Sequence, residues 1–127
     1  MIKKLRAWHK PSKTMREVES IDFKNQTVDL EGGEIEQYFE DVILMQATGL
    51  QDKNGKTYYE CDLVKWDDEI FQVKFDKYQF VLEGFYEPRQ DVPYDFFSEQ
   101  EYQKAEIIGN FYENTELLEG LKNENEI

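Results

Sequence analysis

The segment Asp52-Lys53-Asn54-Gly55-Lys56 constrains the fold of this chain more than any other. An Asn-Gly pair accepts the positive φ values of a type I′ turn with little strain, so antiparallel strands are expected on both sides of it. After the turn, strands are expected at residues 57–66, 70–75 and 79–86, with a further strand at residues 105–112. Three strands of this kind curl readily into a small barrel, which the last strand is expected to close.

The composition also favours sheets over helix bundles. Only 39% of the 127 residues are hydrophobic but 15% are aromatic, so a core must draw heavily on Phe, Tyr and Trp. A chain of this length holds one compact domain, or two lobes that share a core. This length excludes a multidomain enzyme.

The first third of the chain predicts a meander of strands. A strand is expected at residues 2–8, a returning strand around Val18, Ile21 and Phe23, and a third at residues 27–30. Gly32-Gly33 is expected to end the third strand.

A short helix is expected at residues 34–44. The apolar positions Ile35, Tyr38, Phe39, Val42 and Ile43 are separated by three, one, three and one residues, which is helical periodicity. This stripe is expected to form one wall of the core.

Capping residues predict two further short helices. Ser98-Glu99-Gln100-Glu101 has the pattern of a capping box, with Ser98 covering backbone donors and Glu101 reaching back. Asn114 or Thr115 can cap a last helix. The apolar residues of that helix are Leu117, Leu118 and Leu121.

Charge is spread unevenly along the chain. The net charge is −13, yet all the charged residues of the first sixteen positions are basic. Because the acidic remainder repels phosphate backbones, the basic start is expected to dock on acidic residues of its own chain or of a second copy. No stretch of 18 apolar residues occurs, so a cytoplasmic protein without a membrane segment is expected.

Three stretches of the sequence carry a family resemblance. They are Leu5-Arg6-Ala7-Trp8, the run from Met45 to Lys56 (MQATGLQDKNGK), and the run from Ile107 to Asn114 (IIGNFYEN) followed by Glu116-Leu117-Leu118. In order and spacing, the chain resembles the YopX proteins of bacteriophages from about residue 3 to residue 119. The resemblance implies a protein carried by phages and prophages of Gram-positive bacteria, and it brings no catalytic residues to this chain.

The resemblance also implies the architecture. The expected fold is α+β and β-rich, with a small N-terminal α+β lobe packed on an SH3-like β-barrel lobe. The α+β lobe is expected at residues 1–48, the barrel lobe with its closing strand and short C-terminal helix at residues 49–121, and a frayed tail at residues 122–127. The chain departs from the family pattern at Cys61, where glycine is more usual, and at His9, where an acidic residue is more usual. If the family glycine has positive φ, Cys61 must adopt a strained conformation or adjust.

Two sets of residues are candidates for binding. Trp8 lies among basic residues, and such a combination can bind a nucleic acid through base stacking and attraction to phosphate. The candidate set is Lys4, Arg6, Trp8 and Lys10. A surplus of aromatic residues marks a protein interface, unless other parts of the chain cover them. This second set is Tyr78, Phe80, Phe85, Tyr86, Tyr94, Phe96 and Phe97.

Catalytic and metal sites receive little support. Asp67-Asp68-Glu69 with Glu60 and Asp62 has the oxygen ligands that a hard cation needs, but adjacent side chains do not converge by themselves. For Cys61 and His9 the sequence indicates neither an orienting group nor an oxyanion pocket. With one Cys and one His, no disulfide within the chain and no Cys/His zinc set can form. No cofactor and no catalytic residues are expected.

The leading hypothesis is a non-catalytic phage accessory protein that binds a host or phage protein, with a homo-oligomer as a further way to cover the aromatic surface. A DNA mimic, whose carboxylates imitate phosphates, is the alternative, together with direct binding of nucleic acid through the basic first strand. The acidic body argues against direct binding. A metal-dependent hydrolase on the acidic cluster is the remaining hypothesis.

Overall fold

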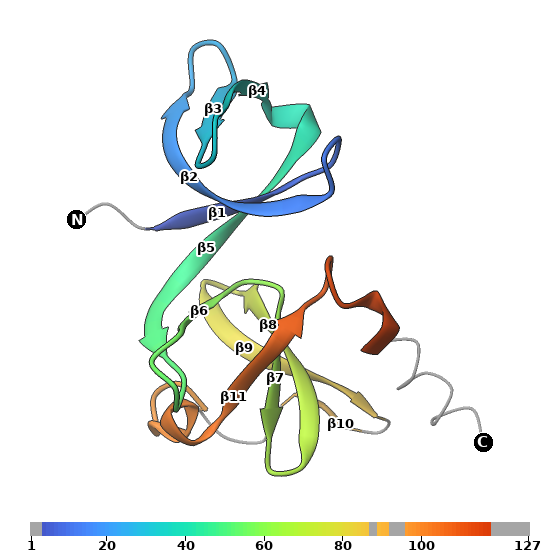
Figure 1. Ribbon diagram of the computed structural model, residues 1–127. Helices are drawn as coiled ribbons and strands as arrows, with labels where there is room; N and C mark the ends of the chain where they lie inside the picture. Colours follow the sequence, from blue (N-terminus) through green and yellow to red (C-terminus); the bar gives the residue numbers. More distant parts are fainter. Residues whose placement is uncertain (1–3, 87–88, 92–95, 118–127) are drawn as a thin grey trace. The chain divides into compact units, whose positions relative to one another are not determined.

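The computed structural model describes residues 4–86, 89–91 and 96–117, which are almost entirely β-strand (Figure 1). The chain divides into two compact units, Met1–Ala47 and Thr48–Ile127. A single long strand, β5 (Val42–Gln51), runs through the boundary between them. Each unit has its own cluster of buried hydrophobic residues.

The first unit is an antiparallel meander. Its strands lie in the order β4-β3-β2-β1-β5, and alternation in β3 buries Val28 and Leu30 while Thr27 and Asp29 stay half-buried. Ala7 and Val42 complete the buried cluster. The elements are β1 (Leu5–His9), β2 (Thr14–Asp22), β3 (Thr27–Leu30), β4 (Glu34–Tyr38) and the 3₁₀-helix η1 (Phe39–Asp41).

The expected helix at residues 34–44 is wrong. Residues 34–38 form β4, which pairs with β3, and β5 begins at Val42 after one 3₁₀ turn. The Asp29 carboxylate accepts a hydrogen bond of 2.8 Å from the backbone N–H of Glu36, whose φ is 52°. Pairing with β3 therefore overrides the helical spacing, and Ile35 and Tyr38 are exposed rather than part of the core.

The second unit contains an open antiparallel sheet with the order β10-β9-β8-β7-β11. Tyr58, Trp66, Phe71 and Phe96 are buried among the aliphatic residues of its core. The elements after β5 are β6 (Thr57–Tyr59), β7 (Asp62–Trp66), β8 (Glu69–Asp76), β9 (Gln79–Tyr86), β10 (Arg89–Asp91), η2 (Glu101–Lys104) and β11 (Glu106–Asn110). The expected strand at 79–86 is confirmed by β9.

The turn at residues 52–56 joins β5 to β6, but it is not a type I′ turn. The N–H of Gly55 donates to the carbonyl of Asp52 at 3.0 Å, and the N–H of Asp52 donates to the carbonyl of Lys56 at 2.8 Å. Gly55 has a φ of 83°, whereas Asn54 has no positive φ. This is the pattern of a type I turn followed by a bulge with glycine in the left-handed region.

Asp52 connects this turn to β11. Its carboxylate is buried, with the residue 5% exposed, and it accepts backbone hydrogen bonds of 2.9 Å from Asn54, Lys56 and Ile107. Lys53 N–H also donates to the carbonyl of Ala105 at 3.0 Å. Burial raises the pKa of Asp52, but the three N–H donors and the charge of Lys56 outweigh it and hold the pKa below its usual value.

The expected single strand at residues 57–66 is interrupted. Cys61 has a φ of 69°, in the left-handed region, and separates β6 from β7. Its N–H donates to the carbonyl of Val73 at 2.8 Å, and its carbonyl accepts from the N–H of Phe111 at 2.8 Å. Cys61 thus adopts the positive φ that the family glycine suggested, and two backbone bonds hold it there.

A corner of hydrogen bonds follows β11. The side-chain oxygen of Asn110 accepts from the N–H groups of Tyr112 and Glu113, at 3.0 and 2.8 Å. The N–H of Asn110 donates to the side chain of Asn114 at 2.9 Å. A Cβ at position 109 would collide with the Asn114 side chain, so only glycine fits there.

The expected fold, an α+β lobe packed on a closed SH3-like barrel, is wrong. The first unit has no α-helix among its described residues, and in the second unit β10 and β11 are the two sheet edges and do not pair in the described part of the chain. The strand expected to close the barrel, β11, is instead an edge strand, and the N–H of Ile107 there is bonded to the carboxylate of Asp52.

The capping box at Ser98 is also wrong. The residue that precedes η2 is Gln100, in the left-handed region with φ 64°, and no side chain caps the helix. A helical turn begins at Thr115, as expected, and is described as far as Leu117. Leu118 and Leu121 lie outside the described residues.

The buried carboxylate predicts acid sensitivity. Because the folded-state pKa of Asp52 is lowered, its stabilising contribution is complete above the unfolded pKa of about 3.9 and is lost as the pH falls through the folded value. In Asp52→Asn the amide group faces the N–H of Ile107, so we expect a loss of about 1–3 kcal/mol at neutral pH. The loss should shrink towards acid pH. Urea unfolding across the acid range measures this, and an equal loss at all pH values would contradict it; exposed Asp76→Asn is the control.

The left-handed conformation of Cys61 predicts that glycine is more stable than alanine at this position. A non-glycine residue in this region destabilises the fold by about 1–2 kcal/mol. Glycine removes this strain, but part of the gain in stability is lost because glycine makes the unfolded chain more flexible. We therefore expect Cys61→Gly to be more stable than Cys61→Ala by about 0.5–1 kcal/mol, since alanine keeps the Cβ. The midpoints of urea unfolding compare the two variants, and a less stable glycine variant would refute the strain argument.

Candidate functional site

The predicted aromatic surface divides between core and solvent. Phe96 is buried, 5.1 Å from the Trp66 ring, and Phe80 and Phe97 pack against the same core. Tyr78 is 96% exposed. The side chains of Phe85 and Tyr86, at the end of β9, and the whole of Tyr94 lie outside what the structure describes.

Tyr78 stands at the tip of the β8–β9 hairpin. Asp76 pairs with Gln79, and the two residues between them, Lys77 and Tyr78, have φ values of 50° and 67°. Two consecutive positive φ values define a type I′ turn, which normally uses Asn and Gly. The chain therefore places a bulky aromatic residue in a strained conformation in full solvent.

Aromatic contacts join this tip to the core. Phe75, 40% exposed, lies opposite Phe80 across the hairpin with ring centroids 5.0 Å apart. Phe80 contacts Phe97 at 6.4 Å, and Phe97 contacts Phe96 at 5.0 Å. These contacts brace the root of the hairpin, so that Tyr78 extends from a packed base.

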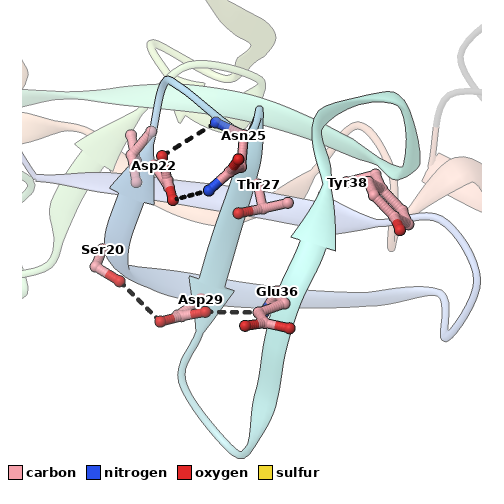
Figure 2. Close-up of a pocket in the computed structure, with 8 residues that line it drawn as sticks. Ser20, Asp22, Asn25, Thr27, Asp29, Glu36 and Tyr38 are labelled. Atoms are coloured by element: carbon pink, nitrogen blue, oxygen red, sulfur yellow. Dashed lines mark hydrogen bonds between the residues drawn. The ribbon is translucent and has the colours of Figure 1, made fainter.

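The first unit carries a polar concavity on the solvent face of β2, β3 and β4 (Figure 2). It has a volume of about 570 Å³. Asp29 lies at its centre and accepts hydrogen bonds from the hydroxyl of Ser20, at 3.0 Å, and from the N–H of Glu36. Asp22 and Tyr38 lie nearer the ends of their strands. We call this surface, with its carboxylates of Asp22, Asp29 and Glu36, the acidic face.

The carboxylate of Asp22 is fully exposed and accepts two hydrogen bonds from Asn25. The backbone N–H and the side-chain amide of Asn25 donate to its two carboxylate oxygens, at 3.1 and 2.7 Å (Figure 2). These bonds lower the pKa of Asp22 below its usual value. Asp22 therefore keeps its negative charge at a lower pH than an ordinary aspartate does.

The predicted acidic cluster on β7 and its turn does not form a site. Asp67 and Asp68 have positive φ and make the type I′ turn between β7 and β8. Asp62 is buried, and its carboxylate accepts from the N–H of Tyr59 at 2.8 Å, which is a structural role. In the described part of the chain, no group of three or more His, Cys, Asp or Glu side chains is arranged to hold a metal ion.

The basic candidates for nucleic-acid binding lie along β1 and just beyond it. Alternation places Arg6 and Trp8 on the face opposite to buried Ala7. Arg6 Nε donates to the sulfur of Met45 at 3.3 Å, and Lys10 Nζ donates to the carbonyl of Glu40 at 3.0 Å. Lys4, just before the strand, is exposed.

His9 has an orienting partner that the sequence did not indicate. Its Nδ1 is 2.6 Å from the hydroxyl of Ser12 and its Nε2 is 2.7 Å from the side-chain oxygen of Gln37 on β4. The spacing of Ser12, three residues after His9 across the Pro11 turn, was visible in the sequence. The contact with Gln37 was not, because it depends on β4 being a strand.

A family model described as YopX protein matches residues 4–119. The chain belongs to the YopX family. The residues that carry the family resemblance include Asp52, Gly109 and Asn110, which form the turn and the corner described above. No curated protein was found to match the chain.

A solved structure shares the fold of this YopX-family chain. It is the crystal structure of protein EF1440 from Enterococcus faecalis, which is 24% identical, has a TM-score of 0.67, and aligns over 93% of this chain and 99% of its own. At this identity the similarity establishes the fold alone. Within the described residues no helix has the length and apolar character needed to cross a bilayer.

Proposed function

We propose that this chain is a phage- or prophage-encoded accessory protein that works without catalysis by binding a host or phage protein in the bacterial cytoplasm. The observation that carries the proposal is the hairpin tip, where Tyr78 is 96% exposed on a strained turn. Tyrosine is one of the residues that dominate the energy of protein interfaces.

The braced root of the hairpin supports this function. A hairpin whose strands are already held together loses less backbone conformational entropy when its tip enters a pocket on a partner. The Phe75–Phe80 pair braces the hairpin, and an ion pair of 2.8 Å between Lys74 and Glu83 joins its strands. The partner is expected to offer an apolar pocket for the Tyr78 ring.

The test is a pull-down with tagged protein from nuclease-treated host lysate, with and without infection, followed by affinity measurement on the protein captured. Removing a central tyrosine typically costs 2 kcal/mol or more, so Tyr78→Ala should weaken binding by about 30-fold. The matched control is Phe23→Ala, which removes another exposed aromatic side chain, in the first unit and outside the lining of the polar concavity.

A further variant separates binding from stability. Lys77→Asn with Tyr78→Gly gives the hairpin the residues that a type I′ turn prefers, so the fold should be kept or stabilised while binding is lost. Equal binding by the parent chain and both Tyr78 variants would refute the role of the tip.

The acidic face supports a second candidate function, the imitation of DNA. Among the described residues, no lysine or arginine side chain is seen bonded to Asp22, Asp29 or Glu36. A surface of carboxylates on a chain with net charge −13 is suited to a basic protein that normally binds phosphate. Such a partner would be released by salt and displaced by DNA.

Charge removal tests this second candidate. Asp22→Asn with Glu36→Gln should weaken the capture of a basic partner and flatten its salt dependence, while Asp29 is kept because it supports β4. Asp67→Asn with Asp68→Asn removes the same charge from a turn in the second unit, where asparagine also tolerates positive φ. A partner equally affected by both pairs, or one that DNA does not displace, would rule out mimicry by this face.

A further inference from the structure

The β1–β2 hairpin contains a continuous series of side-chain hydrogen bonds. Arg16 Nε donates to the Thr14 hydroxyl at 2.9 Å, and the Thr14 and Ser12 hydroxyls are 2.7 Å apart. Ser12 lies 2.6 Å from Nδ1 of His9, and Nε2 of His9 lies 2.7 Å from Oε1 of Gln37. A nucleophilic side chain, a base and an orienting group therefore stand in sequence.

The partners at the end of this series fix the direction of each bond. Gln37 Nε2 donates to the carbonyl of Ile35 at 2.8 Å, which turns Oε1 towards His9 as an acceptor. His9 Nε2 must then carry the proton, and Nδ1 is left as an acceptor. The Ser12 hydroxyl consequently donates to Nδ1, which is the arrangement of a serine beside its general base.

Exposure differs along the series in a way that suits reactivity. His9 is 3% exposed, whereas Ser12 is exposed on the hairpin turn. The base is therefore shielded from bulk water while its serine is open to a reagent. At the other end, the Thr14 hydroxyl can donate to the oxygen of Ser12, and Arg16 Nε donates to Thr14, so that these contacts hold the Ser12 hydroxyl in position.

We propose that Ser12 is a reactive serine that accepts an acyl group from an activated ester. Ser12 Oγ forms a bond to the acyl carbon and the ester C–O bond breaks. The hydroxyl proton passes to Nδ1 of His9 and from there to the departing oxygen, so that no oxidant or further reactant is required. The reaction is a single acyl transfer onto the protein, because turnover would also need donors for the oxyanion. It is independent of the proposed protein-binding function.

The test uses p-nitrophenyl acetate as the acyl donor, with mass spectrometry of the intact protein and of its peptides to separate Ser12 from acetylated lysines. The parent chain should acetylate at Ser12, and Ser12→Ala should lose this site alone. His9→Asn retains an oxygen that accepts the Ser12 hydrogen bond but has no base, so the rate at Ser12 should fall by about 100-fold or more.

One further variant and an internal reference keep the test independent of folding defects. Gln37→Glu places a carboxylate against Nε2–H, where it stabilises the imidazolium formed during transfer, and should acetylate Ser12 faster than the parent. Ser20, an exposed serine bonded to the carboxylate of Asp29 instead of an imidazole, is the internal reference within every sample. Acetylation of Ser12 no faster than Ser20 in the parent, or an unchanged rate at Ser12 in folded His9→Asn, would overturn the proposal.

Discussion

The buried carboxylate of Asp52 holds together parts of the second unit that are far apart in the sequence. It accepts from two N–H groups of its own turn and from Ile107 on β11, 55 residues away. An isolated carboxylate would be expelled from such a site, because burying a charge without hydrogen bonds costs far more than a domain can offset. Three donors make burial possible and lower the pKa at the same time. The same contact satisfies a backbone donor of β11, which forms one edge of an open sheet and not the closing strand of a barrel.

Short-range signals in the sequence predicted the strands better than the connections between them. Turn residues and alternation located β3 and β9, because both act within a few neighbours. The helix expected at residues 34–44 failed for the opposite reason. Its apolar spacing is real, but the side chain of Asp29 and pairing with β3 decide the conformation of residues 34–38, and neither is visible in a local pattern. The type of the turn at residues 52–56 was likewise decided by the carboxylate of Asp52.

The candidate surfaces could be predicted only in part. The surplus of aromatic residues pointed to the β8–β9 hairpin. Composition alone does not show that Phe96 is buried while Tyr78 occupies a turn. That distinction follows from the pairing of Asp76 with Gln79, which leaves two residues in the loop. The Ser12–His9 contact was within reach of the sequence, since the two residues flank one turn. Its orientation was not, because Gln37 comes from β4.

The residues that carry the family resemblance make contacts within the fold, and this indicates which side chains remain for a function. Asp52 and Asn110 have their carboxylate or amide oxygens engaged by backbone N–H groups, and Gly109 is required by the close approach of Asn114. Groups committed in this way stabilise the fold. Under the proposed function, binding falls to side chains that the fold leaves in solvent, and the exposed Tyr78 on its strained turn is such a side chain. A glycine there would relieve the strain, so the proposed contact with a partner would account for the cost of keeping tyrosine.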